Sequence, residues 1–123
     1  MIGYVTIGVS DLEKSKAFYM TLLEEMGVKI AMETDRIAFF STNNGGAMLS
    51  ICLPFNEEAP QPGNGNMVAL MPGSKEAVDR LHNQAIELGA TCDGAPGQRI
   101  PDMFYGAYFL DPDNNKIALA HFG

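Results

Sequence analysis

The chain has 123 residues, of which 46% are hydrophobic and 19% charged, a composition that predicts one packed domain and argues against disorder. Its formal net charge of −7 argues against a nucleic-acid partner, because phosphate contacts need clustered Lys and Arg. No apolar run approaches a membrane span, and no signal peptide is visible, so we expect no membrane partner. Two cysteines, Cys52 and Cys92, make no disulfide framework, which favours a reducing, cytoplasmic location.

The first half of the chain predicts a strand, a helix and three further strands. Residues 3–9 alternate in polarity as a half-buried strand does. Ser10 and Glu13 have the spacing of a capping box, which predicts a helix from there to about Met26, and Gly27 can adopt the left-handed conformation that ends it. Strands are then predicted over residues 28–34, 36–42 and 47–53.

The second half repeats this order after a Pro- and Gly-containing stretch at about 54–66, which we interpret as a linker. A strand is predicted at 67–71, followed by a helix that Ser74 caps and Gly89 ends. Residues 91–102 are predicted to be a Gly- and Pro-rich loop in which a short edge strand can form. A final hairpin joins 104–110 to 116–122 through the turn-forming residues 111–115.

The repeat predicts an α+β fold made of two tandem βαβββ modules, at about 1–55 and 66–123, within one domain over 1–123. Each sheet is expected to bury one face on its helix. A partner module, a partner chain or a ligand must then cover the other face. We expect chemistry in the cleft between the copies.

The segments Gly-Val-Ser-Asp-Leu-Glu-Lys-Ser-Lys-Ala-Phe-Tyr at 8–19 and Asp-Pro-Asp-Asn-Asn-Lys-Ile at 111–117 resemble those of the vicinal oxygen chelate superfamily. This superfamily includes glyoxalase I, extradiol dioxygenases, fosfomycin-resistance enzymes and bleomycin-resistance proteins. The resemblance covers essentially the whole chain. It implies a curved mixed sheet around a cavity, helices on the outer face, and a homodimer.

The resemblance also implies four positions for metal ligands, which fall on Tyr4, Ser50, Met67 and Ala118. A neutral phenol, a hydroxyl, a thioether and a methyl group are poor ligands for a divalent ion. We therefore predict a protein without a metal or any other cofactor, in which the metal-dependent reactions typical of the superfamily do not occur.

Three hypotheses of function follow. The first is a binding protein of the bleomycin-resistance type that holds a cationic or aromatic small molecule, with Tyr4, Met48, Met67 and Tyr105 facing the cavity. The second is a metal-independent lyase or isomerase that uses Tyr4, Tyr105 or His121 as acid or base. The third is a structural or interaction module with a filled cavity. The predicted ligand contacts are Tyr4, Met48, Ser50, Met67, Arg99, Tyr105, Ala118 and His121.

Overall fold

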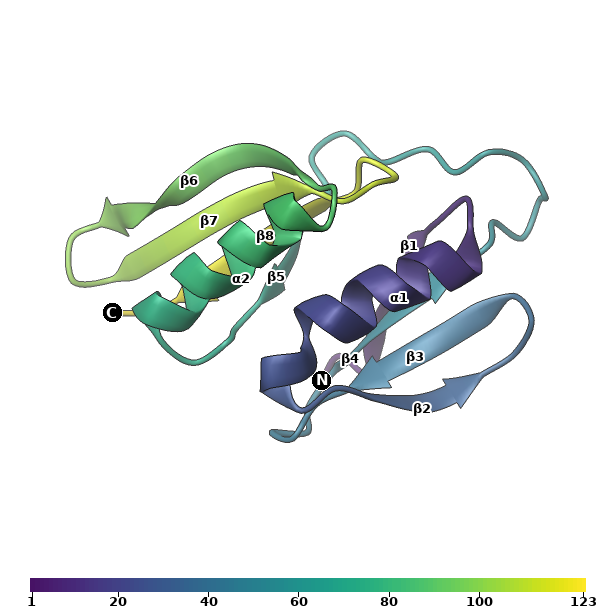
Figure 1. Cartoon of the computed structure of the whole chain (residues 1–123), viewed down its shortest axis with the longest axis horizontal. Helices are drawn as coiled ribbons and strands as arrows, with labels where there is room; N and C mark the ends of the chain where they lie inside the picture. Colours follow the sequence, from purple (N-terminus) through teal and green to yellow (C-terminus); the bar gives the residue numbers. More distant parts are fainter. The chain divides into compact units, whose positions relative to one another are not determined.

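The structure, a computed structural model, describes all residues from Met1 to Gly123. Two compact units make up the chain, Met1–Pro62 and Gly63–Gly123, and their boundary lies within the predicted linker. The first unit holds a helix, a short 3-10 helix and four strands (Figure 1). In chain order they are β1 (Tyr4–Gly8), α1 (Leu12–Leu22), η1 (Glu24–Met26), β2 (Lys29–Glu33), β3 (Ile37–Ser41) and β4 (Met48–Cys52).

The second unit has the same order of elements without the 3-10 helix. They are β5 (Val68–Leu70), α2 (Lys75–Glu87), β6 (Thr91–Ile100), β7 (Phe104–Leu110) and β8 (Lys116–His121). The repeated β-α-β-β-β order is therefore confirmed. Neither helix has the length and apolarity that a membrane crossing requires.

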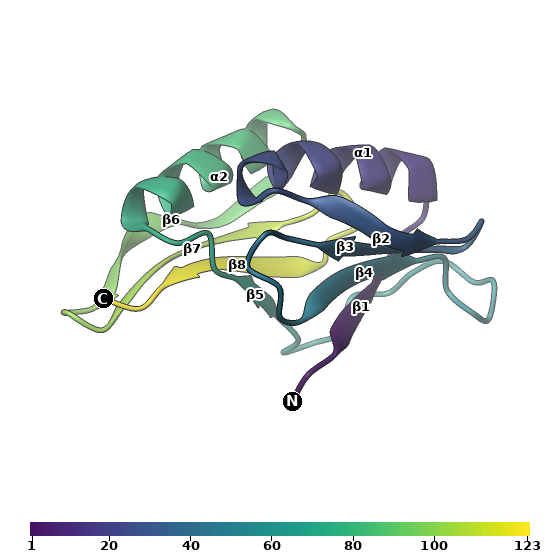
Figure 2. The ribbon, with the colours of Figure 1, turned by 90° about the horizontal axis from the view of Figure 1, so that it is seen from below.

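Each unit forms one four-stranded sheet of mixed direction. The strand orders are β1-β4-β3-β2 and β5-β8-β7-β6, so corresponding strands occupy corresponding places. The first strand of each unit runs parallel to its neighbour, and the other pairs are antiparallel. Both sheets are open and curved, and each carries its helix on one face (Figure 2). The predicted α+β class is thus confirmed.

Each unit is held together by apolar burial between its helix and its sheet. In the first unit, Phe18, Tyr19 and Leu22 of α1 are buried, and the ring centroids of Tyr19 and Phe40 lie 6.0 Å apart. In the second unit, Val78 and Leu81 of α2 are fully buried. Both helices have the apolar stripe of an amphipathic helix, so burial of these side chains fixes which face of each sheet is covered.

The start of α1 differs from the sequence prediction. The N-cap is Asp11 rather than Ser10, and Oδ1 of Asp11 accepts a hydrogen bond of 3.1 Å from the amide of Lys14. A carboxylate caps as well as a hydroxyl, so two adjacent candidates could not be separated by composition. Ser74 caps α2 as predicted, accepting from the amide of Ala77 at 3.0 Å.

The expected loop at 91–102 is also corrected, because most of it is the ten-residue strand β6. β6 is an edge strand, and its pairing with β7 shifts register between Cys92 and Gly94, between Gly94 and Gly97, and between Gln98 and Ile100. An edge position tolerates Pro and Gly, and bulges absorb the irregularity. The strand therefore forms despite a composition typical of a loop.

Candidate functional site

The face of the first sheet that α1 leaves uncovered carries three of the predicted ligand contacts. Phe40 pairs with Leu49 and contacts α1 through Tyr19, which marks one face of the sheet as covered. Side chains alternate between faces along a strand. Met48 and Ser50 of β4 therefore lie on the opposite face, and Tyr4, which pairs with Met48, lies there with them.

On this open face two aromatic rings meet above the strand between them. Tyr4 belongs to β1 and Phe39 to β3, with β4 between these strands, yet their ring centroids are 4.9 Å apart in an edge-to-face arrangement. Since neighbouring strands are about 4.8 Å apart, the rings reach this separation only by leaning toward each other over β4. Sequence reasoning missed Phe39, because β3 is apolar on both faces.

Ser50 lies in β4, directly opposite Phe39 in the register. The residue is fully buried, and its Oγ has no hydrogen-bond partner. Tyr4, by contrast, is 55% exposed and Phe39 is 9% exposed. The open face of the first unit thus combines an aromatic pair, a thioether and an unsatisfied hydroxyl.

The second sheet places two predicted contacts, Tyr105 and His121, on the face that α2 covers. Tyr105 pairs with His121 across β7 and β8, and its phenol donates a 2.6 Å hydrogen bond to Oδ1 of Asp79 in α2. The hydrogen bond to Asp79, followed by burial, raises the pKa of Tyr105. The ammonium of Lys75 lies 5.7 Å from the ring centroid. Tyr105 and His121 are therefore on the side of α2.

The open face of the second sheet carries Ala118 and its register partner Tyr108. Two cations flank the Tyr108 ring, with Cζ of Arg99 5.5 Å and Nζ of Lys116 5.2 Å from its centroid. Arg99 also donates to the carbonyl of Ala95. Lys116 pairs with Asp93 at 3.1 Å, which offsets one of the two positive charges. Arg99 thus belongs to a cation-aromatic cluster that sequence reasoning did not foresee.

The residues at the four positions implied for metal ligands do not fit a divalent ion. Tyr4, Ser50 and Ala118 lie on the open faces of their own sheets, and Met67 precedes β5 with 49% of its surface exposed. Their functional groups are the poor donors noted above. Moreover, no group of three or more His, Cys, Asp or Glu side chains lies close enough together to hold a metal ion.

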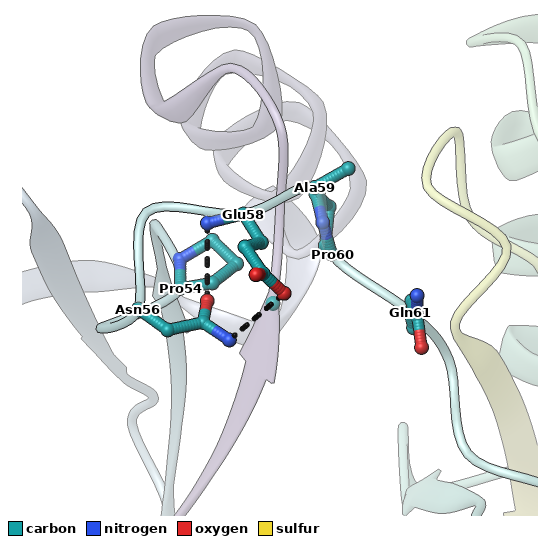
Figure 3. A pocket seen from close by; sticks show the side chains of 7 residues that line it. Pro54, Asn56, Glu58, Ala59, Pro60 and Gln61 are labelled. Atoms are coloured by element: carbon teal, nitrogen blue, oxygen red, sulfur yellow. Dashed lines mark hydrogen bonds between the residues drawn. The ribbon is translucent and has the colours of Figure 1, made fainter.

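A separate pocket of ≈ 330 Å³ lies where the linker leaves β4. It is lined by Gly8, Pro54, Asn56, Glu58, Ala59, Pro60 and Gln61, most of which are labelled in Figure 3. The Asn56 side chain accepts from the amide of Glu58 at 3.1 Å and donates to its carboxylate at 3.4 Å. Asn56 and Glu58 thus bond to each other, and the pocket adds no arrangement that points to catalysis.

Three comparisons with known proteins bear on this site. The family model described as Glyoxalase/Bleomycin resistance protein/Dioxygenase superfamily matches residues 1–119. Among solved structures, a glyoxalase/bleomycin resistance protein from Albidiferax ferrireducens T118 is 35% identical, with a TM-score of 0.89, covering 100% of this chain and 99% of that chain. No protein of curated function matches the chain.

More distant structures share the fold. A glyoxalase/bleomycin resistance protein/dioxygenase family enzyme from Burkholderia phytofirmans PsJN is 22% identical, with a TM-score of 0.78 and 98% of each chain covered. A glyoxalase-related enzyme from Fulvimarina pelagi is 23% identical, with a TM-score of 0.76, covering 98% of this chain and 86% of that chain. The chain belongs to the glyoxalase/bleomycin resistance protein/dioxygenase superfamily.

Proposed function

We propose that the chain is a metal-free binding protein of this superfamily that holds a small aromatic or cationic molecule against the open face of β1, β4 and β3. The observation that carries the proposal is the make-up of that face. Tyr4, Phe39 and Met48 supply aromatic and thioether surface, and Ser50 supplies one hydroxyl. Binding sites for small molecules are typically apolar with a few placed polar groups.

The charge of the protein supports a cationic ligand as one form of this proposal. A net charge of −7 attracts cations over a distance of about a Debye length, roughly 8–10 Å. An exposed aromatic face adds a local attraction, since a cation over a ring contributes about 0.5–2 kcal/mol. Tyr4 is the exposed ring on the open face of the first unit.

The hypothesis of a metal-independent lyase or isomerase is less well supported, because two of its three candidate acids or bases lie on the helix-covered face of their sheet. Tyr105 and His121 lie on the side of their sheet that α2 covers, and the Tyr105 phenol is bonded to Asp79. A general acid or base must lie within hydrogen-bond reach of the reacting atom. Tyr4 is the remaining candidate, and no base lies in hydrogen-bond contact with it.

The proposal includes a homodimer and a cytoplasmic location. An open sheet face with exposed Tyr4 and Met32 favours a covering partner, and Cys52 and Cys92 are both free, as in a reducing compartment. A sedimentation equilibrium mass of two chains is expected. A mass of one chain would remove the dimer from the proposal and leave the binding site unaffected.

The binding proposal is tested with chelator-treated protein and a panel of aromatic amines, phenols and uncharged aromatic compounds, followed by NMR. We expect at least one class to shift the resonances of Phe39 and Met48. The variant Tyr4→Ala is expected to weaken that binding, whereas Tyr105→Phe, on the helix-covered face of the second sheet, serves as its matched control and is expected to leave it unchanged. Equal losses in both variants would contradict the assignment of the site.

A further inference from the structure

The hydroxyl of Ser50 is a buried polar group for which the fold provides no partner. We propose that it is the hydrogen-bonding subsite of the ligand site, closed in the free protein by the ring of Tyr4. A single-ring aromatic compound bearing a hydroxyl or carbonyl oxygen would take the place of the Tyr4 ring against Phe39 and bond to Ser50, and the displaced Tyr4 ring would pack on the outer side of the compound. This inference rests on the proposed function and adds the polar half of its ligand.

The first argument is the state of the hydroxyl. Buried hydroxyls in native proteins nearly always have a partner, and an exception marks strain, a functional role, or a place for a bound water, ion or ligand. Ser50 is fully buried, and its Oγ has none. Neither register partner of Ser50 bonds to its hydroxyl. Phe39 on β3 has an apolar side chain, and Thr6 on β1 is exposed and makes no hydrogen bond to Ser50.

The second argument is the nature of the cover. The Tyr4 ring, whose register partner is Met48, meets the Phe39 ring, whose register partner is Ser50, above β4. We therefore take the Tyr4 ring as part of the cover over Ser50. Tyr4 starts an edge strand, is 55% exposed and follows an exposed N-terminal segment. A ring in this position rotates away at little cost, because few neighbours hold it. Phe39, at 9% exposure, stays in place and offers its ring to the incoming ligand.

These two arguments define the ligand's chemistry. An aromatic ring replaces the edge-to-face contact that Tyr4 makes with Phe39. An oxygen on that ring supplies the hydrogen bond that Ser50 lacks. An unsubstituted ring would fill the same space and leave the hydroxyl unpaired, so the site is expected to discriminate between two ligands of equal shape.

Stability provides the first test. Ser50→Ala removes the unsatisfied group, and we expect its midpoint of thermal unfolding to rise by a few degrees. Ser41→Ala, which deletes a hydroxyl in β3 of the same sheet, is the control and is expected to leave the midpoint of thermal unfolding unchanged. In a Tyr4→Ala background, where water reaches Ser50, the gain from Ser50→Ala is expected to disappear. An unchanged or lowered midpoint for Ser50→Ala alone would overturn the inference.

Binding provides the second test, with phenol and toluene as probes, because they differ only by a hydroxyl in place of a methyl group. We expect phenol to bind the wild-type protein about threefold to tenfold more tightly than toluene, and this preference to vanish in Ser50→Ala. Equal binding of both probes to the wild type would overturn the role of Ser50 and leave the aromatic site intact. If neither probe shifts the Phe39 resonances, the aromatic site and the inference both fail.

Discussion

The phenol of Tyr105 lies 2.6 Å from Oδ1 of Asp79 and donates a hydrogen bond to it, which ties β7 to α2. The acceptor is a carboxylate, so the bond holds the proton on the phenol and raises the pKa of Tyr105. The two residues lie 26 positions apart in sequence, and their contact shows which face of the second sheet the helix covers.

Asp79→Asn is expected to lower the pKa of Tyr105 toward its ordinary value, because the negative acceptor is gone. NMR of the Tyr105 ring during an alkaline titration measures the change. Glu76→Gln serves as the control, since Glu76 acts on Tyr105 only through a weaker charge effect. An unchanged Tyr105 titration in Asp79→Asn would mean that this hydrogen bond is absent in solution.

His82 is expected to make the stability of the protein depend on pH. The residue is buried in α2, its Nε2 has no partner, and burial lowers its pKa, partly offset by a bond to the Tyr108 backbone and by the charge of Asp79. Unfolded His82 takes up a proton as the pH falls through 6.5, whereas the folded residue resists protonation until a lower pH. The contribution of His82 to the free energy of unfolding is therefore constant well above pH 6.5 and decreases as the pH falls below 6.5.

The slope is expected to reach at most about 1.4 kcal/mol per pH unit, between the unfolded and folded pKa values. Urea unfolding at several pH values measures it, and the same series on His82→Gln isolates the contribution. The variant is expected to lose the part of the slope that begins at pH 6.5. Identical slopes for the two proteins would show that His82 is not buried as a neutral group.

The helix caps predict unequal effects of two neighbouring substitutions. Asp11→Ala removes the acceptor for the Lys14 amide and is expected to cost about 1 kcal/mol of stability, as is Ser74→Ala in α2. Glu13→Ala removes only an ion pair with Lys16 from a side chain that is 79% exposed, so a smaller loss is expected. Denaturant melts measure all three. If Glu13→Ala lost more stability than Asp11→Ala, the capping box of Ser10 and Glu13 predicted from the sequence would be supported instead.

Gly94 allows the Tyr108 ring to lie against β6. A Cβ added at Gly94 would stand 2.7 Å from Cδ2 of Tyr108, so Gly94→Ala is expected to displace the ring from Arg99 and Lys116 and to cost about 1–3 kcal/mol. Gly97→Ala is the matched control, because its nearest contact, 3.5 Å to Nη1 of Arg99, is ordinary. For each variant, the NMR shifts of the Tyr108 ring protons report the displacement of the ring, and thermal unfolding reports the loss of stability. Equal melting points for the two variants would contradict the packing.

Much of the fold could be predicted from the sequence because local signals agree with it. Gly27 and Gly89 have positive φ angles of 70° and 105°, as helix-ending glycines should. The turn at 111–115 is held by Asp111, whose Oδ1 accepts from the amides of Asp113 and Asn115, both at 2.9 Å. These features depend on residues close together in the sequence.

The candidate site was less predictable, because it depends on which face of each strand its helix covers. β7 carries Phe104, Tyr105, Tyr108 and Phe109 on alternating faces, so no polarity pattern distinguishes a covered tyrosine from an open one. The pairing of Tyr105 with His121 and of Tyr108 with Ala118 makes that distinction only once the register is known. The contact of Tyr4 with Phe39 likewise depends on the strand order β1-β4-β3.

The most direct test of the central claim, a binding site that does not use a metal, is a thermal unfolding series. Chelator-stripped protein is melted with and without nickel, manganese, iron(II) and zinc. A ligand at about a hundred times its dissociation constant adds roughly 2.7 kcal/mol, which is a shift of several degrees for a domain of this size. We predict an unchanged midpoint with every metal. A clear rise with any one of them would contradict the account and restore a metal site.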